Sequence, residues 1–155
     1  MISSTLKKWI GLPITCENPK TIFVGLIGGV GDLLAAAPSV AALKRKYPKA
    51  KLTFGVGDGI FFNTIKNDPN IDHFETPFSY NVWKKRYHRK TYREKYKEYD
   101  LVFLLDNGNR GWWKPQKHLL DIYAEKCGVT LEQRRPLIYL DNNDIQEAQS
   151  KLNEL

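Results

Sequence analysis

The sequence has little of what would indicate a disulfide scaffold, a metal centre or a membrane span. It holds two cysteines, Cys16 and Cys127, without metal or redox spacing, so neither a disulfide framework nor a zinc site is indicated. The three histidines are dispersed, and we predict no metal site. No apolar run approaches the ~20 residues of a transmembrane helix. Residues 1–10 lack the apolar core and cleavage site of a signal peptide, so we expect a cytoplasmic protein.

Acidic side chains are scarce in one short segment. Between Trp83 and Lys97 the sequence holds eight Lys or Arg residues against Glu94 alone. The chain has 24 Lys and Arg and 17 Asp and Glu, with a net charge of +7, so the rest of it is neutral, with 16 of each sign. A positive charge concentrated in this way indicates an anionic partner.

Short apolar strands alternate with longer helical runs along the chain. This alternation in 155 residues indicates one α/β domain with a Rossmann-like, doubly wound, mostly parallel sheet. The expected strands lie at about 21–27, 51–56, 71–75, 101–105 and 137–140, and the expected helices at about 31–46, 60–67, 82–98, 116–127 and 143–155.

A glycine turn follows the first expected strand and ends at an acidic residue. The turn consists of Gly28, Gly29, Val30 and Gly31, and Asp32 stands where the next helix begins. The amide groups at a helix start suit a phosphate, and open α/β sheets bind ligands at the carboxyl ends of their strands. The lysine of a P-loop and the spacing of a dinucleotide fingerprint are both missing. From its position, Asp32 is either a helix cap or a general base.

The basic segment interleaves cations with aromatic rings at close to helical spacing. The simplest interpretation is an amphipathic helix that packs its rings on the sheet and leaves its lysines in water. A second is a docking element for an anionic acceptor. A third is single-stranded nucleic-acid binding, although no nucleic-acid signature appears, and a fourth is contact with an anionic membrane surface. The candidate binding residues are Lys84, Lys85, Arg86, Arg89 and Lys90.

Asp106 follows the expected strand at 101–105. It therefore shares the carboxyl edge of the sheet with Asp32, where it would either line a cleft or cap its loop.

Residues 22–48, IFVGLIGGVGDLLAAAPSVAALKRKYP, resemble the N-terminal domain of the heptosyltransferase-like glycosyltransferases of family 9. Gly31-Asp32 matches the family's Gly-Asp pair, and Pro38 matches the proline that follows. Residues 99–102 with 106–108, and residues 118–128, resemble the next strand with its loop and the following helix.

The resemblance implies two Rossmann-like domains facing each other across a cleft, the GT-B architecture. Members transfer a sugar with inversion from a nucleotide-sugar to an acceptor, often inner-core lipopolysaccharide, and need no other cofactor. It further implies that Asp32 is the base and that the region of the basic segment lies near the acceptor. A lipid-linked acceptor would bring the protein to the periphery of the inner membrane.

On this basis we expect an extension at 1–19, an acceptor-side domain at 20–142 and the start of an interdomain linker helix at 143–155. A donor domain is absent from these 155 residues, so we expect little or no transfer by this chain alone. The alternative is a non-catalytic module on the same sheet that binds nucleic acid or anionic surfaces.

Overall fold

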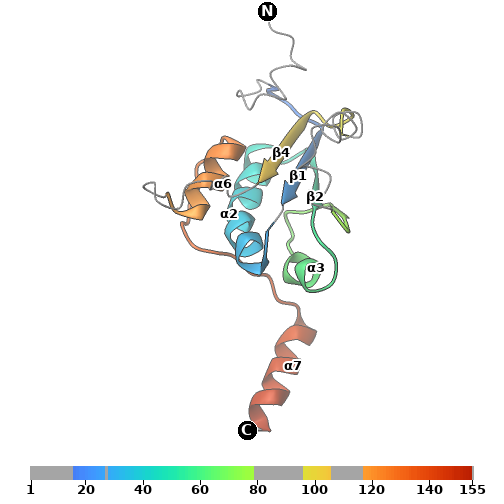
Figure 1. Cartoon of the computed structure of the whole chain (residues 1–155), viewed down its shortest axis with the longest axis vertical. Helices are drawn as coiled ribbons and strands as arrows, with labels where there is room; N and C mark the ends of the chain where they lie inside the picture. The colour runs from blue at the N-terminus through green and yellow to red at the C-terminus, as the bar shows by residue number, and fades with distance from the viewer. Residues whose placement is uncertain (1–15, 27, 79–95, 106–116, 155) are drawn as a thin grey trace, which may run out of the picture.

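Figure 1 shows a computed structural model of the chain, which describes residues 16–26, 28–78, 96–105 and 117–154. None of the helices in these ranges is both long enough and apolar enough to cross a bilayer. The elements, in chain order, are β1 (Thr21–Leu26), α2 (Val30–Lys46), β2 (Lys51–Gly55), α3 (Ile60–Ile65), β3 (His73–Glu75), β4 (Leu101–Leu105), α6 (Leu119–Cys127) and α7 (Asn142–Asn153).

The strands form one four-stranded parallel sheet in the order β3-β2-β1-β4. The strands β2 and β3 follow β1 in order on one side of it, and β4 pairs with the other side of β1. The strand order therefore reverses between β1 and β4, and a reversal of this kind creates a ligand-binding crevice at the carboxyl ends of the two strands. The predicted Rossmann-like parallel sheet is confirmed.

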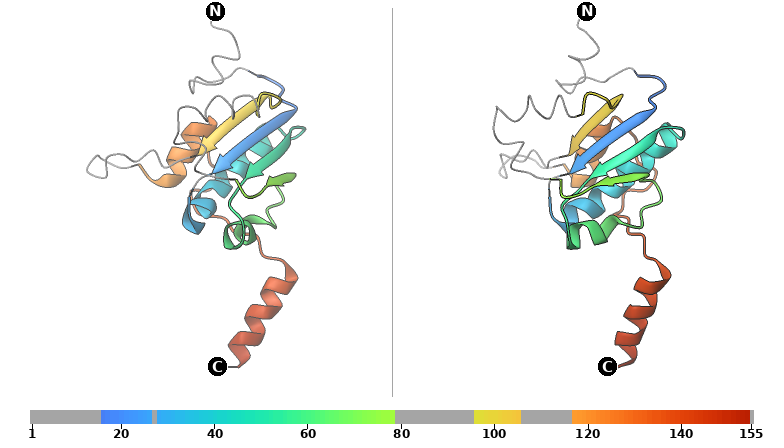
Figure 2. Two further views of the ribbon diagram at one scale, coloured as in Figure 1. Left: turned by 45° about the vertical axis from the view of Figure 1, so that its right-hand side comes forward. Right: turned by 90° about the vertical axis from the view of Figure 1, so that its right-hand side faces the viewer.

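The larger core lies between the sheet and the helices α2, α3 and α6. Alternate residues of β1, namely Ile22, Val24 and Leu26, face these helices and are at most 2% exposed. The helix α2 runs beside the sheet and contacts both α3 and α6 (Figure 2). Gly128 ends α6 in the left-handed conformation, with φ of 62°, as expected for a glycine after a helix.

A second, aromatic cluster covers the other face of the sheet. Phe23 of β1 stacks on Tyr96 with 4.1 Å between ring centroids, and Phe78 packs beside it. The paired glycines Gly25 and Gly55 make room for these rings. A Cβ added to Gly25 would come within 2.7 Å of the Phe78 ring, and one added to Gly55 within 2.8 Å of the Phe23 ring.

The predicted fifth strand at 137–140 is wrong, because this segment is not in strand conformation and pairs with none of the described strands. A buried proline explains where the segment goes instead. Pro38 lies inside α2 and has no N–H, so it leaves the carbonyl of Leu34 without its helical partner. The Leu137 N–H donates to that carbonyl at 3.3 Å, which attaches the segment to α2.

The described part of the basic segment also departs from expectation. Residues 96–98 form a turn, so the predicted helix does not extend to 98, while residues 79–95 lie outside the described ranges. The final helix, expected at 143–155, is α7. It buries none of its residues and projects from the rest of the fold (Figure 1).

Candidate functional site

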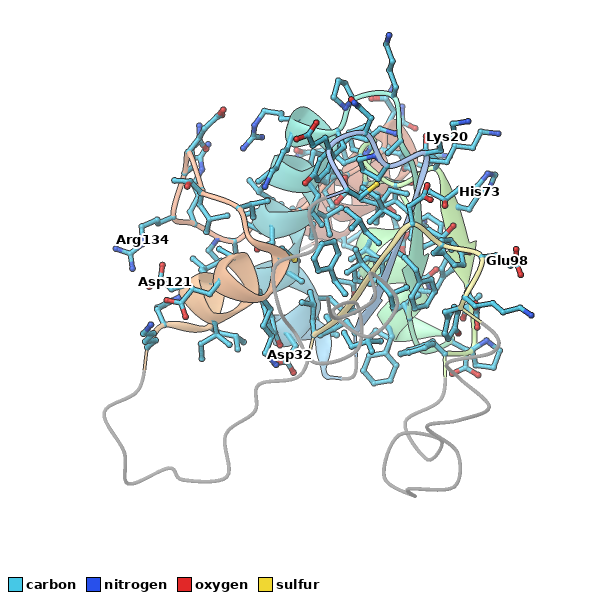
Figure 3. The ribbon with its side chains drawn as sticks, turned by 90° about the horizontal axis from the view of Figure 1, so that it is seen from above. Lys20, Asp32, His73, Glu98, Asp121 and Arg134 are labelled. Carbon is cyan, nitrogen blue, oxygen red and sulfur yellow. The ribbon has the colours of Figure 1, made fainter. Side chains whose placement is uncertain are left out.

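The candidate site lies where β1 ends and α2 begins, beside the reversal in strand order. Gly29 is the N-cap of α2 and Asp32 is the third residue of its first turn. One carboxylate oxygen, Asp32 Oδ2, accepts a hydrogen bond from the Gly29 N–H at 2.7 Å. Asp32 thus has the capping role that its position suggested, and its side chain remains half-buried. In Figure 3 it lies at the margin of the fold.

Space for this carboxylate depends on Gly28. A Cβ added to Gly28 would lie 2.5 Å from the Cβ and Cγ atoms of Asp32, closer than real side chains approach each other. By contrast, a Cβ added to Gly31 meets nothing within 4 Å. Gly28, Gly29 and Gly31 are all exposed. The turn therefore leaves open space around the first residues of α2, next to the carboxylate.

The second carboxylate oxygen is held from another helix. The Tyr123 hydroxyl, on α6, donates to Asp32 Oδ1 at 3.2 Å. Tyr123 is 0% exposed, and 91 residues of sequence separate it from Asp32. Tyr123 was not predicted as a site residue from the sequence, because no local spacing links it to Asp32. One signal in the sequence could have indicated Tyr123, which is a polar aromatic residue on the apolar face of an expected helix. A buried tyrosine hydroxyl needs a hydrogen-bond partner.

The start of α2 has amide groups that suit an anion. Gly29 at the N-cap has no side chain that could accept from the amides of the first turn, and the partial positive charge of a helix start favours negative groups. The Asp32 carboxylate already occupies one of these donors. A phosphate would therefore approach the exposed backbone of the turn from a direction away from Asp32.

The structure does not place the other predicted site residues. Asp106 and the basic residues Lys84, Lys85, Arg86, Arg89 and Lys90 lie outside the described ranges. Within those ranges, no cluster of three or more His, Cys, Asp or Glu side chains could hold a metal ion.

Two shallow hollows lie away from Asp32. One, of about 410 Å³, lies at the C-terminal ends of α2 and α6. Its charged groups are paired, since Lys46 Nζ donates to the Gly128 carbonyl at 2.9 Å and Arg45 contacts Glu132 at 3.0 Å. The other, of about 290 Å³, lies between α3 and α7. Neither adds a chemical group to the site.

Two further titratable side chains are buried without a role at the site. Burial raises the pKa of the Cys127 thiol to about 12, which keeps it protonated and unreactive. Burial also raises the pKa of Asp68, although the backbone and side-chain amides of Asn70 donate to it and oppose the rise.

The similarity of this chain to known proteins is found at the level of structure. The fold is similar to the crystal structure of the glycosyl transferase family 9 protein from Veillonella parvula DSM 2008, with a TM-score of 0.62 and 18% sequence identity. The match covers 90% of this chain and 51% of that one, so the chain spans about half the length of the similar structure. No protein-family model and no curated protein sequence matches the chain. The likeness shows a shared fold.

Proposed function

We propose that this chain is the acceptor-binding half of an inverting, heptosyltransferase-like glycosyltransferase. The observation that carries the proposal is the half-buried Asp32 carboxylate, presented at the carboxyl end of β1 beside the strand-order reversal. Support comes from the similar fold of a protein described as a family 9 glycosyl transferase.

In the proposed reaction Asp32 is the general base. It accepts the proton of an acceptor hydroxyl while the oxygen of that hydroxyl attacks the anomeric carbon of a nucleotide-sugar. The new carbon–oxygen bond forms on the face opposite the leaving group, so the anomeric configuration inverts. The bond to the nucleotide phosphate breaks, and its electron pair leaves with the nucleotide. The turn of Gly28, Gly29, Val30 and Gly31, whose glycines are exposed, would approach the sugar-phosphate closely.

We further propose an anionic glycan or lipid-linked acceptor of the lipopolysaccharide type. The support is the local charge of +7 between residues 83 and 97, which would steer an acceptor that carries phosphate or carboxylate groups. In this proposal Lys84, Lys85, Arg86, Arg89 and Lys90 bind the acceptor, Asp106 lines the cleft, and contact with a lipid-linked acceptor takes place at the membrane surface.

A second domain would complete the donor site. Residues 143–155 would begin the linker to that domain, and the apolar side chains around α7 support this role. Within the described ranges, four of the five large apolar residues that are more than half exposed fall between 138 and 152: Ile138, Leu140, Ile145 and Leu152. An apolar surface of this kind is typical of an interface. Without the donor domain, we expect the 155 residues alone to transfer little sugar.

The test is a transfer assay on the polypeptide encoded by the whole reading frame that contains this chain. A panel of nucleotide-sugars is offered with phosphorylated glycan acceptors, nucleotide release is measured, and the product's anomeric configuration is read by NMR. The proposal predicts release that depends on the acceptor and a product of inverted configuration. A product of retained configuration would contradict the proposed mechanism, and no release with any donor would contradict the transferase proposal.

The concentrated positive charge also supports a second candidate, a non-catalytic module that binds nucleic acid or anionic surfaces. Replacing Lys84, Lys85 and Arg86 by Gln would then abolish binding to single-stranded DNA or anionic vesicles, with a steep salt dependence in the unmodified protein. In that case Asp32→Asn would change neither binding nor any other activity.

A further inference from the structure

Tyr123 has a buried ring and a hydroxyl that reaches the candidate site. The side chain belongs to the main core cluster and to α6, the helix that contacts α2 and β4. Its hydroxyl donates to Asp32 Oδ1 at 3.2 Å. The distance is longer than the ~2.5–3.0 Å usual for a hydroxyl donor and an oxygen acceptor, so the hydroxyl contributes direction to the carboxylate more than strength.

The Asp32 carboxylate is thereby held at both oxygens by two separate elements. The turn before α2 supplies the Gly29 N–H to Oδ2 at 2.7 Å, and α6 supplies the Tyr123 hydroxyl to Oδ1. The missing side chain at Gly28 leaves the carboxylate space in this orientation. An Asp side chain rotates about two bonds, and donors on both oxygens restrict both rotations. Each carboxylate oxygen accepts at more than one site, so an acceptor hydroxyl can still bind.

We propose that Tyr123 is a positioning residue that fixes the orientation of the Asp32 carboxylate toward the acceptor hydroxyl. The inference rests on the proposed function for its catalytic meaning, although the positioning itself is measurable without any substrate. Tyr123 touches no reacting atom in this proposal. It acts through Asp32, and a base held in place reacts faster than one that must first be oriented.

The Gly29 amide proton reports on the position of Asp32, because it donates to Oδ2. In Tyr123→Phe the ring and its packing are retained and only the hydroxyl is lost. We expect the Gly29 amide to move upfield in the NMR spectrum and to exchange with solvent about fivefold faster, the factor typical of losing one net hydrogen bond. Tyr139→Phe is the matched control, because that hydroxyl is hydrogen-bonded to Asn70 at 3.2 Å, and the Gly29 amide should not respond to its loss.

A double-mutant cycle separates positioning from general loosening of the core. In an Asp32→Ala background the Gly29 amide has lost its carboxylate acceptor, so adding Tyr123→Phe should leave the exchange rate of this amide unchanged. An equal acceleration in both backgrounds, or no acceleration in either, would overturn the proposal. The same conclusion would follow if Tyr139→Phe moved the Gly29 amide as much as Tyr123→Phe.

Kinetics on the polypeptide of the whole reading frame test the catalytic consequence. Tyr123→Phe should lower kcat by about tenfold, less than the ~10²- to 10⁴-fold contribution of the general base itself, with little change in the KM for the acceptor. A response of the Gly29 amide in a protein without transferase activity would uphold the positioning and refute the proposed function. Transferase activity in a protein whose Gly29 amide does not respond to Tyr123→Phe would support the proposed function and refute the positioning role.

Discussion

At the scale of single residues, Asp32 combines a structural and a chemical role. Its carboxylate satisfies the Gly29 N–H at the start of α2, as many aspartates do at helix starts. The same carboxylate is half-buried at the edge of the sheet where ligands bind in folds of this class. The capping bond does not compete with proton transfer, since it occupies only part of the accepting capacity of one oxygen.

Gly28 and Gly31 provide a matched pair of substitutions beside Asp32. We predict that Gly28→Ala destabilises the fold by about 1–3 kcal/mol, the range for an added methyl group that forces its neighbours to shift, because the methyl group would clash with the Asp32 side chain although position 28 is exposed. The new Cβ would lie 2.5 Å from Asp32 Cβ, whereas a Cβ at Gly31 meets open space. Urea unfolding measures both variants. Equal stabilities for Gly28→Ala and Gly31→Ala would contradict the packing described around Asp32.

Asp72 carries a pH-dependent contribution to stability. Burial raises the pKa of Asp72. The hydrogen bond from the Leu52 N–H at 2.7 Å and the ion pair with Lys44 Nζ at 2.6 Å lower it by more, so the pKa lies below the ordinary value. The stabilisation is therefore present above the unfolded pKa of about 3.9 and is lost as the pH falls through the lower folded value.

We predict that Asp72→Asn lowers the free energy of unfolding by about 1 kcal/mol or less near neutral pH, the scale of a partly exposed ion pair. The difference from wild type should shrink as the pH falls below the unfolded pKa. Denaturant unfolding at neutral and acidic pH measures this difference. A difference that grows toward acidic pH would contradict the assignment.

The sequence was informative about Asp32 and uninformative about its partner. An apolar strand, a glycine turn and an aspartate are consecutive, so their local pattern predicted the position of Asp32 and gave a helix cap as one of its two possible roles. Tyr123 reaches Asp32 only because α6 packs on α2, and that packing depends on the whole fold. The sequence also could not show that position 28 requires glycine, because this requirement follows from the orientation of the Asp32 side chain.

At the scale of secondary-structure elements, Pro38 explains both a success and a failure of sequence reasoning. The helix α2 was predicted to continue through Pro38, and it does. The carbonyl that Pro38 leaves free binds the Leu137 N–H, and the segment after Leu137 therefore does not join the sheet. Its run of apolar residues has the composition of a strand, but composition alone cannot show whether a neighbouring strand edge is open.

We predict that Pro38→Ala weakens the attachment of this segment. Alanine at 38 supplies an N–H that competes for the Leu34 carbonyl, so the Leu137 amide should exchange about fivefold faster, as expected for one net hydrogen bond. Hydrogen exchange followed by NMR measures this, with the Tyr47 amide, bonded to the Leu43 carbonyl at 2.9 Å, as an internal control. Unchanged protection of Leu137 would contradict the role given to Pro38.

At the scale of the whole molecule, the described part of the chain divides into a packed sheet-and-helix unit and a projecting helix. The helix α7 is attached near its start, where Asn67 Nδ2 donates to Asp144 at 3.0 Å and Lys66 Nζ contacts the same carboxylate at 3.6 Å. The remainder of α7 packs against nothing in the described ranges that would bury a residue.

Removal of residues 142–155 should therefore leave the rest of the protein folded. The lost contacts are of the surface type, worth about 1 kcal/mol or less, so we predict a fall in melting temperature of about 4 °C or less. Circular dichroism against temperature measures it. A larger fall, or loss of cooperative unfolding, would show that α7 belongs to the packed unit.

The account depends most on the assignment of Asp32 as the base, and one comparison of turnover rates tests it directly. Asp58 is an exposed aspartate in the turn after β2, at the same edge of the sheet, and provides the matched control. In the polypeptide of the whole reading frame, Asp32→Asn should lower kcat by about 10² to 10⁴-fold, the contribution of a general base, while Asp58→Asn keeps the wild-type rate. Full turnover in Asp32→Asn would contradict the account.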